Sequence, residues 1–208
     1  MTRICIVGHG PSMLQNRYGE WIDSHDVVVR LKEHRHLMAM PEHFGTKRTV
    51  HAYSLILAPK FYQAYSCIQW IIPDTRNNPD ARRRAESDYP DAIIKNKLLG
   101  DWNEQYRHNR EKILLDRRQV TTTLGGEYGH NHMSQGLAAI CYALKAYFPK
   151  ELSLPGFDNL LSGEFNPSLA LRPWDKTGNE YPDHNWPAER KTLYQMLEHY
   201  GTEIRTSP

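Results

Sequence analysis

The sequence lacks any apolar run near the length of a membrane-spanning helix, and it has only three cysteines among its 208 residues. Because a spanning helix needs about 20 predominantly apolar residues, this absence argues against an integral membrane protein. Cys5, Cys67 and Cys141 are odd in number and far apart, which is not a disulfide framework and indicates a reducing compartment. The first residues also lack the features of a secretory signal. We therefore expect a soluble, cytoplasmic protein with no membrane span.

An excess of charge of either sign is also missing. The 26 Lys and Arg residues nearly balance the 24 Asp and Glu residues, for a formal net charge of +2. This balance excludes a strong electrostatic footprint for nucleic acid and an acidic tail. Aromatic residues make up 11% of the chain, which argues against disorder. The length predicts a single domain over residues 1–208.

Short β-branched runs alternate with helical patterns along the chain. Strands are predicted at Arg3–Val7, Asp26–Arg30, Thr49–Ser54, Cys67–Ile72, Glu151–Leu154 and Thr202–Arg205. The two clearest helices are predicted at Ser134–Phe148 and Pro187–Tyr200. In the first of these helices Ser134 is a natural N-cap, and one face carries Leu137, Ile140, Cys141, Leu144 and Phe148. The alternation predicts an α/β sandwich with a mainly parallel sheet.

Two regions are less regular. Residues 74–115 are polar, with apolar residues at helical spacing only in patches such as Ile93, Ile94 and Trp102. We expect two helices on the rim of the fold there, as a variable insertion. Residues 159–183 contain several prolines and glycines and predict a long loop.

Ligands of parallel α/β sheets lie beyond the carboxyl ends of the strands, where we expect three loops to converge. The loops are Gly8–Ser12, Gly125–Ser134 and Gly156–His184. In the first loop, small residues would let the backbone approach a phosphate. A dinucleotide fingerprint would need glycine where Met13 stands and an acidic residue near Arg30. The alternative is a tight strand-to-helix turn that serves packing.

The start of the helix at Ser134 is a second candidate site. Its free N–H groups and positive dipole end suit an anion near Ser134, Gln135 and Gly136. The alternative is an ordinary N-cap. A third candidate is His184, just before the last helix, because a neutral imidazole can act as a general base. For Glu189, in the first turn of that helix, the alternative is a capping box that bonds amides near the helix start.

Metal-binding patterns are weak. Two histidine pairs, His34 with His36 and His130 with His132, are not joined by cysteine or aspartate at structural-zinc spacing. No Asp-x-Asp occurs in the chain. We therefore expect neither a metal nor another cofactor.

Read together, these segments resemble the motifs of glycosyltransferase family 29, the sialyltransferases. Cys5–Ser12 followed by Gly19–Arg30 resembles the large sialylmotif, through Gly-x-x-Ile-Asp-x-His-Asp-x-Val-x-Arg. Ser134–Gly136 with Lys150–Asp158 looks like the small sialylmotif, and His184-x-x-x-x-Glu189 is similar to the very small motif. The three motifs occur in the family's order, and residues 55–120 match none of them.

The resemblance implies a minimal, soluble prokaryotic or viral relative with a GT-A-like, Rossmann-type three-layer sandwich. It implies an inverting, metal-independent transfer of a sugar from a nucleotide-sugar donor, possibly CMP-linked, to the hydroxyl of a glycan or of a modified nucleic acid. His184 becomes the catalytic base and Glu189 a support that takes no part in the chemistry. Residues 74–115 become the acceptor side or lid. The implied donor-binding residues are Gly8, His9, Gly10, Pro11, Ser12, Arg30, Lys32, Ser134, Gln135, Gly136, Gly156, Phe157 and Asp158.

The chain departs from the family at positions that bear on the donor. The family usually has asparagine where His9 and Lys32 stand, and threonine where Gln135 stands. The family's cysteine in the small motif falls near Pro149, so its cross-motif disulfide is not expected here. Sialic acid and another sugar both remain open. A non-catalytic nucleotide-binding module of the same fold and a Rossmann-type oxidoreductase are the alternatives.

Overall fold

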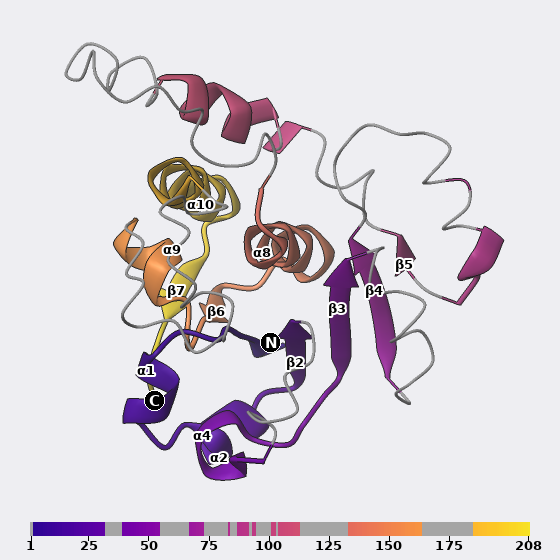
Figure 1. The fold of residues 1–208 in the computed structure, drawn as a ribbon, viewed down its shortest axis with the longest axis vertical. Helices are drawn as coiled ribbons and strands as arrows, with labels where there is room; N and C mark the ends of the chain where they lie inside the picture. The colour runs from indigo at the N-terminus through magenta and orange to yellow at the C-terminus, as the bar shows by residue number, and fades with distance from the viewer. Residues whose placement is uncertain are drawn as a thin grey trace, which may run out of the picture.

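A seven-stranded parallel sheet forms the centre of the described chain, in the order β5-β4-β3-β2-β1-β6-β7 (Figure 1). The structure is a computed structural model that describes residues 2–31, 39–54, 67–72, 83, 87–91, 93–94, 101–102, 104–112, 133–163 and 185–208. The strands are β1 (Ile4–Val7), β2 (Val27–Leu31), β3 (Val50–Ser54), β4 (Ile68–Ile72), β5 (Ile93–Ile94), β6 (Glu151–Ser153) and β7 (Glu203–Arg205). The helices are α1 (Ser12–Gln15), α2 (Gly19–Asp23), α4 (Pro41–Phe44), α8 (Gln135–Tyr147), α9 (Asp158–Ser162) and α10 (Trp186–Tyr200).

Both faces of the sheet are covered by helices, because the strands are apolar on both sides. In β1, Ile4 and Ile6 join a core cluster with α8, α9 and α10, whereas Cys5 and Val7 join a smaller cluster with Met13 and other residues near α1, α2 and α4. Figure 1 shows α8 and α10 on one side of the sheet and α1, α2 and α4 on the other. The predicted α/β sandwich with a mainly parallel sheet is therefore confirmed.

The long elements agree with the sequence pattern and several short ones do not. Each predicted strand is present to within one residue at either end. Ile93–Ile94, expected within a helix, instead forms β5 and pairs with Trp70 and Ile71. This correction fits the preference of adjacent β-branched residues for strands. Residues 158–162, predicted as part of a loop, form α9. Helices of four or five residues, such as α2 and α4, are too short to leave a periodic signature.

The strongest helix, α8, begins as predicted. The Ser134 side chain accepts a hydrogen bond from the Leu137 N–H at 3.1 Å and so caps the helix. Leu137 and Leu144 are fully buried, as the apolar face requires. Phe148 was expected on the same face, but it is 71% exposed. It lies one residue beyond the helix as a left-handed C-cap with φ 45°, which turns its side chain away from the core.

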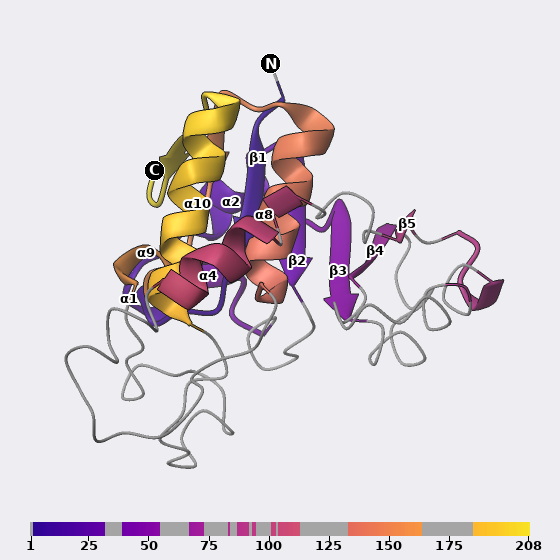
Figure 2. The same ribbon diagram turned by 90° about the horizontal axis from the view of Figure 1, so that it is seen from above.

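Residues 104–112 are helical and pack against α10. The Asn109 side-chain nitrogen donates to the Thr192 hydroxyl at 2.9 Å and to the side-chain Oε1 of Gln195 at 2.7 Å. Tyr106 and Asn109 are fully buried. Figure 2 shows this segment crossing the outer side of α8 and α10. This described part of the expected insertion therefore contributes to the core.

No helix in the described residues is long and apolar enough to cross a membrane. The thiols of Cys5, Cys67 and Cys141 are all free. Cys5 and Cys141 belong to the clusters on opposite faces of the sheet.

Candidate functional site

The order of the strands reverses between β1 and β6, which lie side by side in the sheet. In an open parallel sheet such a reversal opens a crevice at the carboxyl ends of the two strands, and ligands bind there. The segments that leave this edge are residues 8–11 after β1, called the β1 loop, and residues 154–157 after β6, called the β6 loop. They contain six of the thirteen donor-binding residues that the sequence predicts, and Ser12 and Asp158 directly follow them.

The two loops are bonded to each other through their backbones. The Gly8 N–H donates to the Pro155 carbonyl at 2.8 Å, and the Gly10 N–H donates to the Gly156 carbonyl at 2.7 Å. Just beyond the β1 loop, the Ser12 N–H donates to Oδ2 of Asp158 at 3.1 Å. These three amides therefore hold the two segments together. This role agrees with the alternative of a tight turn that serves packing, which the sequence analysis considered beside phosphate binding.

Glycine is required in the β1 loop by the closeness of the β6 loop. A Cβ on Gly8 would lie 2.2 Å from the Gly156 carbonyl oxygen, and one on Gly10 would lie 1.9 Å from Oδ2 of Asp158. Both distances are far below van der Waals contact. Gly156 itself has φ +73°, a conformation that favours glycine. The glycines thus serve the packing of the two loops, and a further role toward a phosphate stays a prediction.

Phe157 connects the β1 loop to the start of α8. Its ring is 8% exposed, and its atoms lie 2.9 Å from the positions that a Cβ would take on Gly8 and on Gly136. The ring therefore fills the space between two glycines that are 128 positions apart in the sequence. The structure brings the Gly8, Ser134 and Gly156 regions together, as the parallel-sheet topology predicted.

At the start of α8, two backbone amides have no hydrogen-bond partner among the described residues. The Ser134 hydroxyl caps the Leu137 N–H, and the Ser134 carbonyl accepts from the Ala138 N–H. Within the described chain, no hydrogen bond uses the N–H of Gln135 or of Gly136. The Oε1 atom of Gln135 is also buried without a hydrogen-bond partner. Free amides at a helix N-terminus and an unsatisfied polar atom beside them suit a ligand with anionic and donor groups.

A buried carboxylate ties this helix start to α10. Oε1 of Glu189 accepts the Ser134 N–H at 2.9 Å, and Oε2 contacts the Ser134 hydroxyl at 2.6 Å. Glu189 is fully buried. The alternative of a capping box within its own helix is wrong. Asn185 caps α10 by accepting the Ala188 N–H at 3.1 Å, which leaves the Glu189 carboxylate to reach across to α8.

Two residues of the large motif, Asp23 and His25, bond the segments that lie on either side of β2. Asp23 accepts from the Thr46 and Lys47 N–H groups at 2.8 Å each. His25 contacts the Ser153 hydroxyl through Nε2 at 2.8 Å and the Trp21 carbonyl through Nδ1 at 2.8 Å. Burial lowers the pKa of His25, while its backbone contacts oppose this shift. The motif therefore fixes the second strand against its neighbours.

Arg30, predicted to bind the donor, is largely buried in this same support. Its Nε donates to the Lys47 carbonyl at 2.9 Å, and its Nη2 lies 3.8 Å from Oδ1 of Asp23. Burial lowers the pKa of the guanidinium to about 10, although Asp23 opposes the shift. These contacts of Arg30 support the fold, and its role toward a donor stays a prediction.

Several predicted residues lie outside the described chain. These are Lys32, His34, His36, His130, His132 and the proposed base His184. His9 and Pro11 are described and partly exposed on the β1 loop. In the part of the chain that the structure covers, no three His, Cys, Asp or Glu side chains are grouped as metal ligands.

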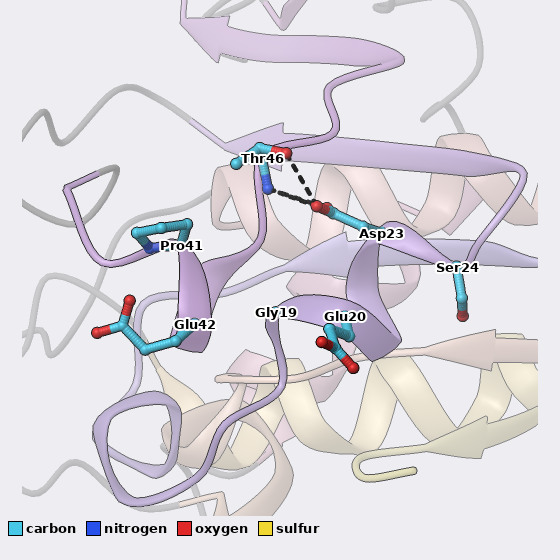
Figure 3. Close-up of a pocket in the computed structure, with 7 residues that line it drawn as sticks. All are labelled: Gly19, Glu20, Asp23, Ser24, Pro41, Glu42 and Thr46. Carbon is cyan, nitrogen blue, oxygen red and sulfur yellow. Dashed lines mark hydrogen bonds between the residues drawn. The ribbon is translucent and has the colours of Figure 1, made fainter.

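A hollow of about 570 Å³ lies elsewhere, between α2 and α4 (Figure 3). It is lined by Gly19, Glu20, Asp23, Ser24, Pro41, Glu42 and Thr46. Ser24 and Thr46 lead into the amino ends of β2 and β3, so the hollow does not belong to the crevice at the carboxyl ends. The carboxylate of Asp23 already accepts hydrogen bonds from Thr46 (Figure 3). We assign no ligand to this hollow.

Sequence reasoning missed Tyr106, which lies in the segment that matched no motif. Its side chain is fully buried, and its phenol lies near Glu189 of α10. Burial and the nearby Glu189 carboxylate raise the pKa of this phenol. An isolated tyrosine in a polar segment gives no sequence signal for such a contact.

No protein-family model and no curated protein sequence matches the chain. Solved structures do match it. One match is a crystal structure of a mammalian sialyltransferase in complex with Gal-β-1-3GalNAc-ortho-nitrophenol. The aligned region covers 100% of this chain and 70% of the sialyltransferase chain, with a TM-score of 0.58 and 15% identity. A second mammalian sialyltransferase structure has the same coverage and TM-score at 17% identity. A third match is the α-2,3-sialyltransferase from Campylobacter jejuni in apo form. The aligned region covers 99% of this chain and 75% of the Campylobacter chain, with a TM-score of 0.59 and 15% identity.

These comparisons define a class of fold. The chain is similar over its whole length to sialyltransferases, which are glycosyltransferases, and at this identity the likeness shows the shared fold.

Proposed function

We propose that the protein is a glycosyltransferase of the sialyltransferase type, which moves a sugar from a nucleotide-sugar donor to an acceptor hydroxyl. One observation carries the proposal. The β1 loop, the β6 loop and the start of α8 meet at the switch point of a sheet whose fold is similar to that of sialyltransferases. The motif resemblance places the donor nucleotide against these same three segments.

The donor phosphate would lie at the start of α8. The unused N–H groups of Gln135 and Gly136 and the positive end of a 13-residue helix would stabilise the negative charge that develops on the leaving nucleotide. Glu189 orients Ser134 at this point through both of its carboxylate oxygens. No step in this scheme calls for a metal or a cofactor.

In the proposed reaction His184 takes the proton of the acceptor hydroxyl. The acceptor oxygen forms a bond to the anomeric carbon as the bond from that carbon to the donor phosphate oxygen breaks, with inversion. The nucleotide leaves with the bonding electron pair, and the proton stays on the imidazole. A sialic acid donor linked to CMP and a galactose-terminated glycan acceptor are the first candidates, because the mammalian neighbour binds a galactoside.

The oxidoreductase alternative lacks part of the dinucleotide-binding motif. Met13 stands where a dinucleotide fingerprint would have its third glycine. Its side chain is fully buried, and its Cγ lies 2.6 Å from the position of a Cβ on Gly156. Met13 therefore packs against the β6 loop, at the position where the fingerprint would require a glycine.

The proposal is tested by thermal shift with CMP, UDP, GDP, TDP and NAD, followed by transfer assays with the matching nucleotide sugars. A ligand at 100 times its Kd adds about 2.7 kcal/mol, which corresponds to a rise in Tm of about 5–10 °C. We expect CMP to give the largest shift and CMP-sialic acid to serve as donor to lactose. Stabilisation by NAD without any shift from the nucleotides would overturn the proposal.

A further inference from the structure

An aromatic surface lies where α8 and α10 end, side by side (Figure 2). The ring centroid of Phe148 is 6.0 Å from that of Tyr200. The Tyr200 ring lies 4.8 Å from His199 and 6.2 Å from Trp102, and the Trp102 indole nitrogen donates to the Tyr200 hydroxyl at 3.4 Å. These four residues, called the aromatic patch, come from three separate segments of the chain and form one connected set of ring contacts.

Much of the aromatic patch is open to solvent. Phe148 is 71% exposed, and His199 is also exposed. Tyr200 and Trp102 are partly buried, because they pack against the main core and so hold the patch in place. A single exposed apolar side chain is common on a protein surface, but connected aromatic rings around an exposed phenylalanine are typical of an interaction surface.

The backbone of Phe148 gives a second indication. It ends α8 in the left-handed region with φ 45°, whereas α9 and α10 end in that region at Gly163 and Gly201. A side chain at such a position destabilises the chain in a way that glycine avoids. The exposed ring gains little burial to offset this strain within one copy of the chain. Backbone strain of this kind is concentrated at functional positions, and an intermolecular contact would bury the ring.

Charges of both signs surround the aromatic patch. Lys150, before β6, is exposed, and so are Glu198 on α10 and Glu203 on β7. Among the described residues, none of these three side chains forms an ion pair. The Glu203 N–H donates to the Lys150 carbonyl at 2.8 Å, so the two opposite charges start from neighbouring backbone positions. Glu151 lies directly opposite Glu203 in the sheet, and such a like-charged pair is unfavourable without a cation beside it.

We propose that the aromatic patch is the centre of a two-fold interface with a second copy of this chain. Both copies use the same surface in a two-fold contact, so that surface has to be complementary to itself. The two Phe148 rings would pack across the axis, and Lys150 of each copy would meet Glu203 of the other. A nucleic acid or an anionic membrane would instead need a surface of predominantly positive charge, which the three glutamates exclude here.

The interface leaves the crevice of each copy open. The aromatic patch lies next to the amino ends of β6 and β7, whereas the crevice lies at the carboxyl ends of β1 and β6. The inference therefore does not depend on the proposed function, and it is tested without donor or acceptor.

The first test is sedimentation equilibrium of the full chain over the micromolar range. We expect the wild type to change from monomer to dimer with concentration and to go no further, because a two-fold interface closes. Phe148→Gly removes the ring and leaves the residue that this backbone favours, so it should raise the dimer Kd by about 30-fold or more. Tyr194→Ala is the control, because Tyr194 is another exposed aromatic residue of α10, outside the patch. A wild type that stays monomeric, or equal Kd values for the two variants, would overturn the inference.

The second test exchanges charges. Lys150→Glu and Glu203→Lys should each raise the dimer Kd by about 10-fold or more, because like charges then face each other twice across the axis. An equimolar mixture of the two variants should form a heterodimer about as tight as the wild-type dimer, because opposite charges then meet at both places. Lys191→Glu, at an exposed position of α10 outside the patch, should keep the wild-type Kd.

Two outcomes of these measurements would contradict the interface. A mixture that associates no better than either variant alone would show that Lys150 and Glu203 do not meet across a two-fold axis. Pelleting of a monomeric wild type with vesicles of phosphatidylcholine and phosphatidylglycerol, and its loss in Phe148→Gly, would assign the aromatic patch to a membrane surface and overturn the inference.

Discussion

Replacing Glu189 with alanine should strongly destabilise the protein, because its buried carboxylate joins α10 to Ser134 at the start of α8. The side chain is fully buried, and it contacts the Ser134 N–H at 2.9 Å and the Ser134 hydroxyl at 2.6 Å. Each hydrogen bond to a buried charge contributes about 1.5–3 kcal/mol. Loss of both would therefore cost about 3–6 kcal/mol, a fall in Tm of about 6–24 °C.

Glu189→Gln gives a graded comparison. The retained amide oxygen can still accept the Ser134 N–H, and the new NH₂ group can donate to the Ser134 hydroxyl oxygen. The hydroxyl proton then loses its acceptor, so we expect a smaller cost of about 1–2 kcal/mol. Glu203→Ala is the matched control, because Glu203 is an exposed glutamate on β7 and should change stability by less than about 0.5 kcal/mol.

Urea denaturation monitored by circular dichroism measures these differences as shifts of the midpoint at constant slope. A double-mutant cycle with Ser134→Ala should give a coupling energy of about 1–3 kcal/mol between the two side chains. The reasoning is refuted if Glu189→Ala is as stable as Glu203→Ala, or if the cycle shows no coupling.

Three further predictions concern other residues. His184→Ala should lower turnover by about 10²–10⁴-fold while Tm and nucleotide affinity stay near wild type, and loss of nucleotide binding by calorimetry would make His184 a donor ligand instead. Because burial lowers the pKa of His25, the unfolded chain binds the proton more readily, so stability should fall as the pH drops below the unfolded pKa of about 6.5. Melting curves at pH 7.5 and 5.5 should show a smaller fall in His25→Gln than in the wild type, and equal falls would contradict this. Phe148→Gly should raise stability by about 1 kcal/mol because it relieves a left-handed backbone with φ 45°; a loss comparable to that of Leu144→Ala would show that the exposed ring contributes to the core.

The sequence alone was sufficient for the elements with a strong periodic signal. β-branched runs predicted β1, β2, β3 and β4, and the apolar face with its serine cap predicted α8. The short strands β6 and β7 were predicted as well. These signals are local, since strand and helix patterns repeat every two or 3.6 residues. The alternation of the elements then restricted the sheet to a mainly parallel one and placed the candidate crevice at its carboxyl edge.

The contacts that make up this edge were decided by the tertiary structure. Nothing near Gly10 in the sequence shows that the Asp158 side chain occupies the space that a Cβ at position 10 would take. Likewise, nothing near Glu189 shows that its carboxylate bonds Ser134 and not the start of its own helix. The same is true of Asn109 and Thr192, which are 83 positions apart in the sequence. Such pairings depend on how whole elements pack, so a pattern read over one or two turns of chain carries no information about them. The residue types thus determined which secondary structures form, and packing around the sheet determined which of those residues meet.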